Sequence, residues 1–320
     1  MRISFLGPSA TFTHQAALLL PESSNAELIP AVTTGAALAS VRRHEADFAC
    51  VPIENSVEGG VPAVLDDLVT GLPLVIVKEV HIVVQFALMT RSGTLLEEIR
   101  TVGSHPHAIA QARQWLAANL RAASTVMTSS TAEAAAQVAY GELDAAISAP
   151  IAASANELAI LANDIADTPA AVTRFVLIRR PCAPPAPTGA DRTLLAVTST
   201  NQPGSLVALL TELSIRGIDL TRLESRPNKS ARNSPWFYLD CAGHVADPAI
   251  GEAMAALKRR CDQVRYLGSY PCGSSPDEST PPAGGGRQAG AHDITRAVDP
   301  SGDRSFRASL DWLRQIRAGA

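Results

Sequence analysis

The sequence predicts an α/β domain followed by a smaller α+β domain, and three features predict it. From residue 1 to about 180, short apolar β-type runs alternate with alanine-rich helical stretches, an order typical of an α/β domain with a mostly parallel sheet. A Pro-rich segment at 181–190 then interrupts the pattern and reads as a semi-rigid linker. After it the expected elements follow the order βαββαβ, which is typical of the ferredoxin-like α+β fold.

The strands of the first domain are expected where apolar and β-branched residues gather, at 2–6, 47–53, 74–89, 100–104, 124–128, 144–148 and 171–178. Helices are expected between them, for example at 34–46, 107–120 and 131–143. The run 74–89 is about twice the mean strand length, which suits a segment crossing between two lobes.

In the second domain, strands are expected at 192–199, 218–225, 235–242 and 264–270, with helices at 203–217 and about 247–261. The first of these helices is expected to have Pro203 at its first position and Gly217 at its end. Residues 273–304 are rich in Gly, Pro, Ser and Asp, which predicts disorder. The segment 305–320 carries Phe306, Leu310 and Leu313 at helical spacing and is expected to form a short amphipathic helix.

Composition excludes several function classes. The chain has 320 residues and a formal net charge of −4, so no basic footprint points to nucleic acid or to an anionic membrane. The longest apolar run is interrupted by Lys78, Glu79, His81 and Gln85, and the N-terminus lacks the apolar region of a signal peptide. The 5 cysteines form no metal-ligand spacing, and the chain has neither a P-loop nor a G-x-G-x-x-G motif. We therefore expect a cytoplasmic protein without metal or cofactor.

Polar clusters follow several expected strands at the point where a helix begins: "GPSATFTH", "PIENS", "GSHPH" and "SST". In α/β domains ligands bind beyond the carboxyl ends of the strands, where helix N-termini present free N–H groups to anions. These clusters therefore predict a site for a small molecule that bears carboxylates. Each also has a plainer interpretation: Thr11, Thr13, Ser56, Ser130 and Thr131 are all good helix N-caps, and His105 and His107 suit an ordinary helix start.

Taken together, the motifs resemble the prephenate dehydratase family with a C-terminal ACT regulatory domain. The resemblance covers residues 2–272 and depends on "FLGPSATFTHQAA", "CVPIENSVEGGV", "VGSHPHAIAQARQWL", "SSTAEAAAQVA" and "TRFVLI", followed by "NQPGSLVALL" and "LTRLESRP". It implies a cofactor-free hydro-lyase that converts prephenate to phenylpyruvate in phenylalanine biosynthesis. Two alternatives stay open: an arogenate dehydratase and a non-catalytic amino-acid sensor.

The resemblance implies a two-lobed catalytic domain like the periplasmic binding proteins, over residues 1–180. Lobe 1 would hold about 1–76 and 158–180, and lobe 2 about 77–157. The ACT domain would span 191–272. Members assemble through this domain, so we expect a homotetramer, with a dimer as the alternative.

The resemblance also assigns site residues. Thr173 would assist departure of the substrate hydroxyl, with Arg174 and Glu54 as further catalytic residues. Alternation along the strand places Thr173 and Phe175 on one face and Arg174 on the other. The residues expected to bind substrate are Thr11, Asn55, Ser56, Ser104, Gln111, Ser129, Ser130, Thr131 and Phe175.

In the second domain the resemblance implies that L-phenylalanine, as an inhibitor, contacts Asn201, Gly204, Ser205, Leu206, Glu224, Ser225 and Arg226. The chain departs from the usual family pattern at four positions. Ala10 stands where Gly is usual, Ala170 and Ala171 stand where Asn commonly precedes the Thr-Arg pair, and Ser205 stands where Ala is usual.

Overall fold

The computed structural model describes residues 1–167, 171–228, 234–273 and 302–319, the last range by its backbone alone as far as residue 306. Of the stretch 273–304 that was expected to be disordered, 274–301 lies outside the described residues, and the prediction is wrong at 302–304, which begin the helix Gly302–Ala318. The chain divides into two compact units, one formed by residues 1–65 and 80–176 and the other by 66–79 and 177–320. The short segment 66–79 therefore packs with the C-terminal part of the chain.

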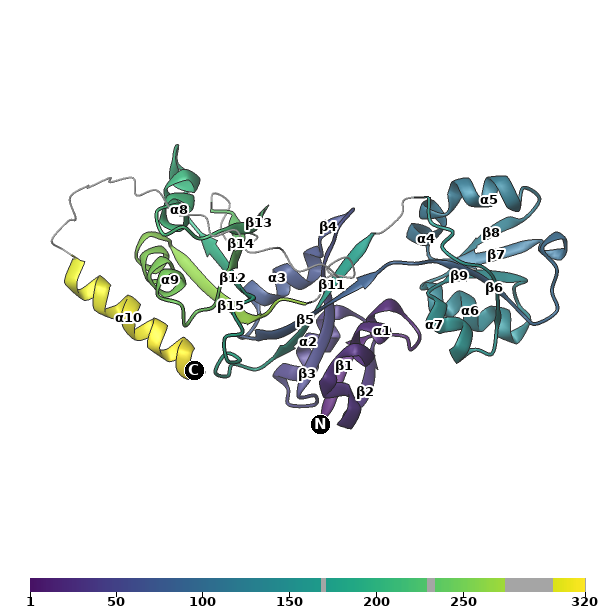
Figure 1. Cartoon of the computed structure of the whole chain (residues 1–320), viewed down its shortest axis with the longest axis horizontal. Coiled ribbons are helices and arrows are strands. Elements are labelled where there is room, and N and C mark those ends of the chain that lie inside the picture. Colours follow the sequence, from purple (N-terminus) through teal and green to yellow (C-terminus); the bar gives the residue numbers. More distant parts are fainter. Residues whose placement is uncertain (168–170, 229–233, 274–301, 320) are drawn as a thin grey trace. The chain divides into compact units, whose positions relative to one another are not determined.

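A six-stranded sheet with the order β2-β1-β3-β11-β5 holds the first lobe together, and the two-residue strand β4 pairs with β3 (Figure 1). Strands β2 and β3 both pair in parallel with β1. The strands are β1 Arg2–Leu6, β2 Glu27–Ala31, β3 Phe48–Asn55, β4 Gly59–Gly60, β5 Val75–Val83 and β11 Val172–Arg179. The helices are α1 Phe12–Leu19, α2 Thr34–Arg42 and α3 Pro62–Thr70, with a 3-10 turn at Pro21–Asn25.

The second lobe has a five-stranded sheet with the order β10-β6-β9-β7-β8. Its strands are β6 Ala87–Thr90, β7 Thr101–Ser104, β8 Ser124–Met127, β9 Ala145–Ser148 and β10 Ala159–Ala162. Its helices are α4 Pro106–Gln111, α5 Arg113–Asn119, α6 Thr131–Tyr140 and α7 Pro150–Ala155, with a 3-10 turn at Leu96–Glu98. The sheet is mixed rather than mostly parallel, because β6 runs antiparallel to both β9 and β10.

Sequence and structure differ at the sheet edges and at helix ends. The run 74–89 forms two strands, β5 in one sheet and β6 in the other. The edge strands β2 and β10 were missed; they have only 5 and 4 residues and are only partly buried or exposed. The expected helix 107–120 is divided into α4 and α5, since the backbone of Ala112 leaves the helical region.

The C-terminal unit contains a four-stranded antiparallel sheet with the order β13-β14-β12-β15. Its elements are β12 Asp191–Thr198, α8 Ser205–Ser214, β13 Leu220–Arg226, β14 Trp236–Ala242, α9 Pro248–Arg260 and β15 Gln263–Pro271. This is the βαββαβ order that the sequence predicts. Helix α8 begins at Ser205 rather than at Pro203, because Gly204 with φ +85° occupies the N-cap position.

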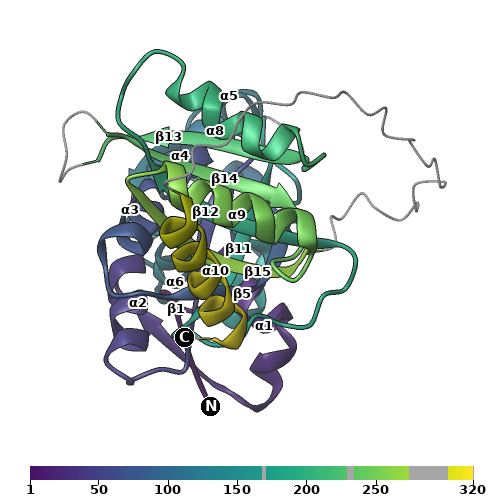
Figure 2. The same ribbon diagram turned by 90° about the vertical axis from the view of Figure 1, so that its left-hand side faces the viewer.

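Helix α10 Gly302–Ala318 lies against α9 on the helical side of the four-stranded sheet (Figure 2). Its Leu313 and Ile316 are buried in the core formed with α8, α9 and the sheet. The guanidinium of Arg317 donates from Nε and Nη2 to the carbonyl oxygen of Val245 at 3.1 and 2.8 Å. The expected C-terminal helix is therefore an integral part of this unit. Among the described residues, no helix is long and apolar enough to cross a membrane.

A glycine in β15 allows close approach between backbones within the C-terminal unit. Gly268 has φ +141°, and a Cβ at this position would meet the carbonyl oxygen of Ile76 and lie 3.0 Å from its backbone nitrogen. Because backbone atoms at Ile76 cannot rotate away as a side chain would, the contact requires glycine.

We expect Gly268→Ala to lower the free energy of unfolding by about 2 kcal/mol or more, through overpacking and an unfavourable φ. Chemical denaturation of the purified variant measures this value. Gly189→Ala is the matched control, since it shares a positive φ of +88° but meets no atom within 4 Å. Equal losses in the two variants would show that φ strain alone, and not the contact with Ile76, determines the effect.

Candidate active site

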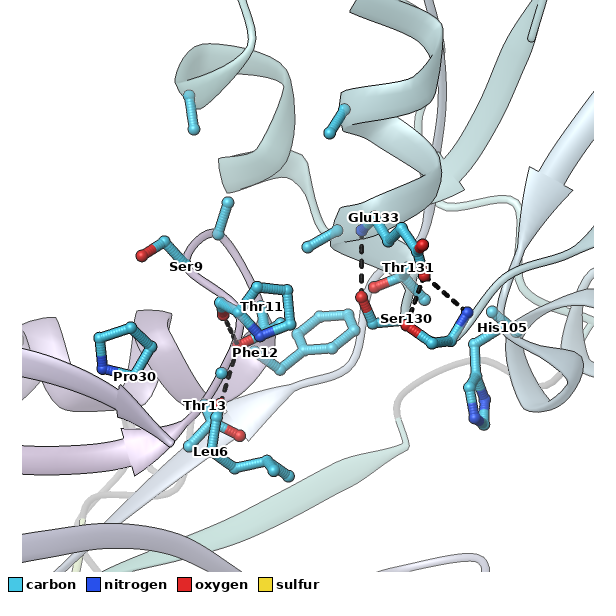
Figure 3. Close-up of a pocket in the computed structure, with 18 of the residues that line it drawn as sticks. Leu6, Ser9, Thr11, Phe12, Thr13, Pro30, His105, Ser130, Thr131 and Glu133 are labelled. Carbon is cyan, nitrogen blue, oxygen red and sulfur yellow. Dashed lines mark hydrogen bonds between the residues drawn. The ribbon is translucent and has the colours of Figure 1, made fainter. Parts of the chain in front are cut away.

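A cavity of about 1220 Å³ lies in the N-terminal unit, lined by the loop after β1, the ends of β2 and β3, the start of β11 and the starts of α4 and α6. These are the strand ends and helix starts at which the sequence placed its polar clusters. Figure 3 shows Thr11 and Phe12 on one side of the cavity and Ser130 and Thr131 at the start of α6 on the other. The wall also contains apolar side chains, with Phe12 and Phe86 in edge-to-face contact at 5.5 Å between ring centroids.

The Thr173 hydroxyl lies in the cavity wall and is only 8% exposed. The amide nitrogen Nδ2 of Asn55 donates to Thr173 Oγ1 at 2.9 Å. The amide oxygen of Asn55 accepts from the backbone N–H groups of Val57 and Glu58 at 2.9 and 3.1 Å. These two donors fix the orientation of the amide, so Thr173 Oγ1 must act as the acceptor. The Thr173 O–H is thereby left to donate to a molecule in the cavity.

Arg174 and Glu54 form an ion pair that does not line the cavity. Arg174 Nε lies 3.2 Å from Glu54 Oε2, and Arg174 is 4% exposed. Because side chains alternate along a strand, Arg174 points away from the face that carries Thr173. The pair joins β3 to β11 next to the Asn55–Thr173 hydrogen bond, so its contact with a bound molecule would be indirect.

The N-terminus of α6 lines the cavity through Ser129, Ser130 and Thr131. Ser130 caps the helix, its Oγ accepting from the N–H of Glu133 at 3.0 Å. The backbone N–H and the hydroxyl of Ser129 both donate to the Glu133 carboxylate, and these hydrogen bonds lower the pKa of that carboxyl. Two of these polar side chains therefore organise the helix start, whose first-turn N–H groups favour an anion.

The loop after β1 is held by Thr11 and His14. Thr11 Oγ1 donates to Pro8 O at 3.1 Å and caps α1 by accepting from the N–H of His14. The N–H of Ala10 donates to His14 Nδ1 at 3.0 Å. Ala10 has φ +65°, a region that costs a side-chain-bearing residue about 1 kcal/mol, which gives a physical reason for the glycine usual at this position.

The remaining residues expected to bind substrate lie outside the cavity lining. Ser56 Oγ accepts from the N–H of Val172 at 2.9 Å, and Ser104 is fully buried with its hydroxyl donating to Ile147 O at 2.6 Å. The backbone carbonyl of Gln111 accepts from Asp167, and Phe175 is buried in the core. In this structure these residues hold the walls together.

His105 and His107, interpreted from the sequence as helix-start residues, both line the cavity. Their rings stack at 5.3 Å, and His107 Nδ1 lies 2.7 Å from Glu58 Oε1. Burial lowers the pKa of His105. The sequence feature that could have identified them as cavity residues is their position directly after a strand, which they share with the other polar clusters. Within the described residues, no group of three or more His, Cys, Asp and Glu side chains is placed to hold a metal ion.

In the C-terminal unit, Gly204 forms the left-handed N-cap of α8, with Asn201 in the preceding loop and Ser205 and Leu206 in the first turn. Glu224, Ser225 and Arg226 lie on β13. Glu224 and Arg226 already hold charged partners, as described below. The structure thus places the two expected effector motifs at the start of α8 and along one strand.

The model of the prephenate dehydratase family matches residues 3–183, more than half of the chain. The chain belongs to the prephenate dehydratase family. A prephenate dehydratase of Amycolatopsis methanolica is 46% identical over 320 residues, which cover 99% of this chain and 98% of the relative. Similarity therefore extends through the C-terminal unit, beyond the part that the family model matches.

Two solved structures resemble the whole fold of this family member. A prephenate dehydratase from Arthrobacter aurescens in complex with L-Phe is 38% identical, with a TM-score of 0.81 and 99% of both chains covered. GqqA, described as a novel type of quorum quenching acylase, is 30% identical, with a TM-score of 0.76 over 86% of this chain and 99% of its own.

The hydrogen bond from the Ala10 N–H to His14 Nδ1 makes the stability of the loop after β1 depend on pH, because protonation of His14 removes the acceptor. Burial lowers the pKa of His14 below its usual 6.5, and its ring stacks on Phe5. The unfolded chain therefore binds a proton at His14 more readily than the folded chain, so the contribution of this group to stability is present above pH 6.5 and is lost as the pH falls below it.

We expect the melting temperature to fall between pH 7 and pH 5, and to fall less in His14→Asn, whose Oδ1 keeps an acceptor near the position of Nδ1 but does not titrate. Thermal unfolding followed by circular dichroism at several pH values measures this. His44→Asn on the surface is the control. An unchanged acid-side slope in His14→Asn would contradict the assignment.

Proposed function

We propose that this chain converts prephenate to phenylpyruvate, carbon dioxide and water, as the names of its full-length relatives suggest. The observation that carries the proposal is the Thr173 hydroxyl, held by Asn55 as an acceptor and left to donate into a cavity of suitable size. Arogenate dehydration and amino-acid sensing without catalysis remain the alternatives to be tested.

The reaction breaks two bonds and needs one proton. The C–C bond to the ring carboxylate breaks and releases CO2, its electron pair enters the ring, and the C–O bond at the opposite ring carbon breaks as the ring becomes aromatic. The leaving hydroxide takes up a proton and departs as water. Because aromatisation accepts the electrons, the protein must chiefly orient the dianion and stabilise the leaving oxygen.

We assign that stabilisation to the Thr173 O–H, which donates a hydrogen bond to the leaving oxygen. A neutral hydroxyl is a weak acid, so it acts as a donor and not as the final source of the proton. We assign the start of α6, with Thr131 and its first-turn N–H groups, to binding of a substrate carboxylate, because it lines the cavity and helix N-termini favour anions. Arg174 and Glu54 fix the strand that carries Thr173.

Regulation is assigned to the C-terminal domain, the four-stranded unit over residues 191–272, which we propose is an ACT domain that binds L-phenylalanine as an inhibitor. The support is the complex of the related Arthrobacter enzyme with L-Phe and the βαββαβ order of this unit. We also propose a cytoplasmic homotetramer, whose mass light scattering would measure.

The first experiment follows formation of phenylpyruvate from prephenate by the purified protein. We expect Thr173→Ala to lower kcat by about 100-fold or more, because the donor to the leaving oxygen is lost, while Thr173→Ser keeps most of the rate. Thr125→Ala on the exposed strand β8 is the control. Turnover of arogenate but not prephenate would favour the first alternative, and a Thr173→Ala variant as active as the parent would contradict the role of Thr173.

Direction of the hydrogen bond gives a second test. In Asn55→Asp the carboxylate still accepts from the N–H groups of Val57 and Glu58, but it now accepts from the Thr173 O–H as well. We expect kcat to fall by about tenfold or more, with the melting temperature within a few degrees of the parent protein. Steady-state kinetics beside thermal unfolding separate the two effects. Full activity in Asn55→Asp would show that the hydroxyl direction does not matter.

A further inference from the structure

A series of ion pairs, here called the ionic chain, runs across the four-stranded sheet and reaches α3 and β5, which include residues of the segment 66–79. The ionic chain begins in α3, passes along β13, β14 and β12, and ends in β5. Its members all lie in the C-terminal unit. In order they are Asp66, Arg226, Glu224, Arg222, Asp240, Arg192 and Glu79.

Each link joins opposite charges. At the α3 end, Arg226 Nε donates to Asp66 Oδ1 at 2.8 Å, and Arg226 Nη1 lies 3.7 Å from Glu224 Oε1. The other carboxylate oxygen of Glu224 accepts from Arg222. One guanidinium therefore connects α3 to the motif "ESRP", and the same motif continues the chain into the sheet.

At the β5 end, Asp240 receives two guanidinium groups. Arg222 Nη1 lies 3.4 Å from Asp240 Oδ2, and Arg192 Nη1 lies 3.9 Å from Oδ1. Arg192 Nε is in turn 3.5 Å from Glu79 Oε2. The side chains of Asp240 and Glu79 are 0% exposed. A buried charge that loses its partner is strongly unfavourable, so a change at one link is passed on to the next.

The helix and the strand that carry the two ends of the ionic chain both extend into the N-terminal unit. Helix α3 begins at Pro62, in the N-terminal unit, and contains Asp66, the first residue assigned to the other unit. Strand β5 contains Glu79 and ends at Val83, next to Val84 of the cavity lining. A helix and a strand therefore carry the charge chain towards the turn at Asn55 and towards the cavity wall.

We propose that this ionic chain couples the effector motif to the catalytic cavity, a proposal that rests on the proposed function. An amino acid carries one ammonium and one carboxylate, the groups that Glu224 and Arg226 are equipped to bind. When it binds at this motif, its carboxylate competes with Asp66 for Arg226, and its ammonium competes with Arg222 for Glu224. The link between β13 and α3 then weakens, and α3 shifts; this helix comes directly after strand β4, which pairs with Glu54 and Asn55. Asp66 is the residue that receives the signal, and it does not contact substrate.

The test compares Asp66→Asn with the parent protein in two measurements. Asn keeps the shape of Asp66 but removes the charge that attracts Arg226. Because Asp66→Asn breaks the link that phenylalanine is proposed to weaken, we expect turnover without phenylalanine to fall about threefold or more, towards the inhibited rate of the parent, and saturating phenylalanine to lower it little further. Calorimetric titration of phenylalanine should give a Kd equal to or lower than that of the parent, because Glu224 and Arg226 are unchanged and Asp66 no longer competes for Arg226. Glu45→Gln breaks the exposed Arg43–Glu45 pair and serves as the control.

Several outcomes overturn the proposal. Turnover and inhibition unchanged in Asp66→Asn show that the ionic chain does not transmit the signal, and lost phenylalanine binding makes Asp66 part of the effector site. Glu79→Gln removes the charge at the opposite end of the ionic chain. The test can therefore be made with whichever of the two variants remains folded, as judged by circular dichroism. A parent that turns over prephenate and neither binds nor responds to phenylalanine contradicts regulation and coupling together. A parent that binds phenylalanine but lacks turnover contradicts the catalytic assignment.

Discussion

The hydrogen bond from Asn55 to Thr173 is the constraint on which the site depends. It joins side chains 118 residues apart, on β3 and β11, which are neighbours in the first sheet. Its direction is set by two backbone donors in the turn after β3, and not by any bound molecule. The Thr173 hydroxyl, which we propose as the donor to the leaving oxygen, is therefore oriented by the protein itself, which is the kind of preorganisation that lowers an activation barrier.

The sequence predicted part of this site through one rule, that polar residues at the carboxyl ends of strands line the ligand site. Polar clusters after strands were predicted to meet at one cleft, and Thr11, Asn55, Ser130 and Thr131 do line one cavity. Thr173, which also lines it, was indicated only by the family resemblance. The rule also covered residues such as Ser104, whose hydroxyl is consumed by a backbone carbonyl inside the wall. Whether a polar side chain faces a cavity or the core depends on tertiary contacts, which spacing along the chain does not specify.

The βαββαβ order of the second domain was predictable because each of its strands and helices has a clear local pattern. The ionic chain could not be predicted from the sequence. The bond between Arg226 and Asp66 spans 160 residues, and neither residue sits in a pattern that marks it as paired. Similarly, no local pattern explained why glycine is usual at position 10, whereas the positive φ of Ala10 in the structure does.

The packing of segment 66–79 with the C-terminal unit bears on how modular this architecture is. The proline-rich stretch at 181–190 resembles a domain boundary. An N-terminal fragment that ended there would keep Glu79 but lose its partner Arg192. It would also keep Ile76 but lose β15, whose Gly268 packs against the Ile76 backbone. Along the sequence, the C-terminal unit is thus interleaved with the N-terminal unit rather than appended to it. Recombination between relatives at this stretch would separate the 66–79 segment from the residues with which it packs.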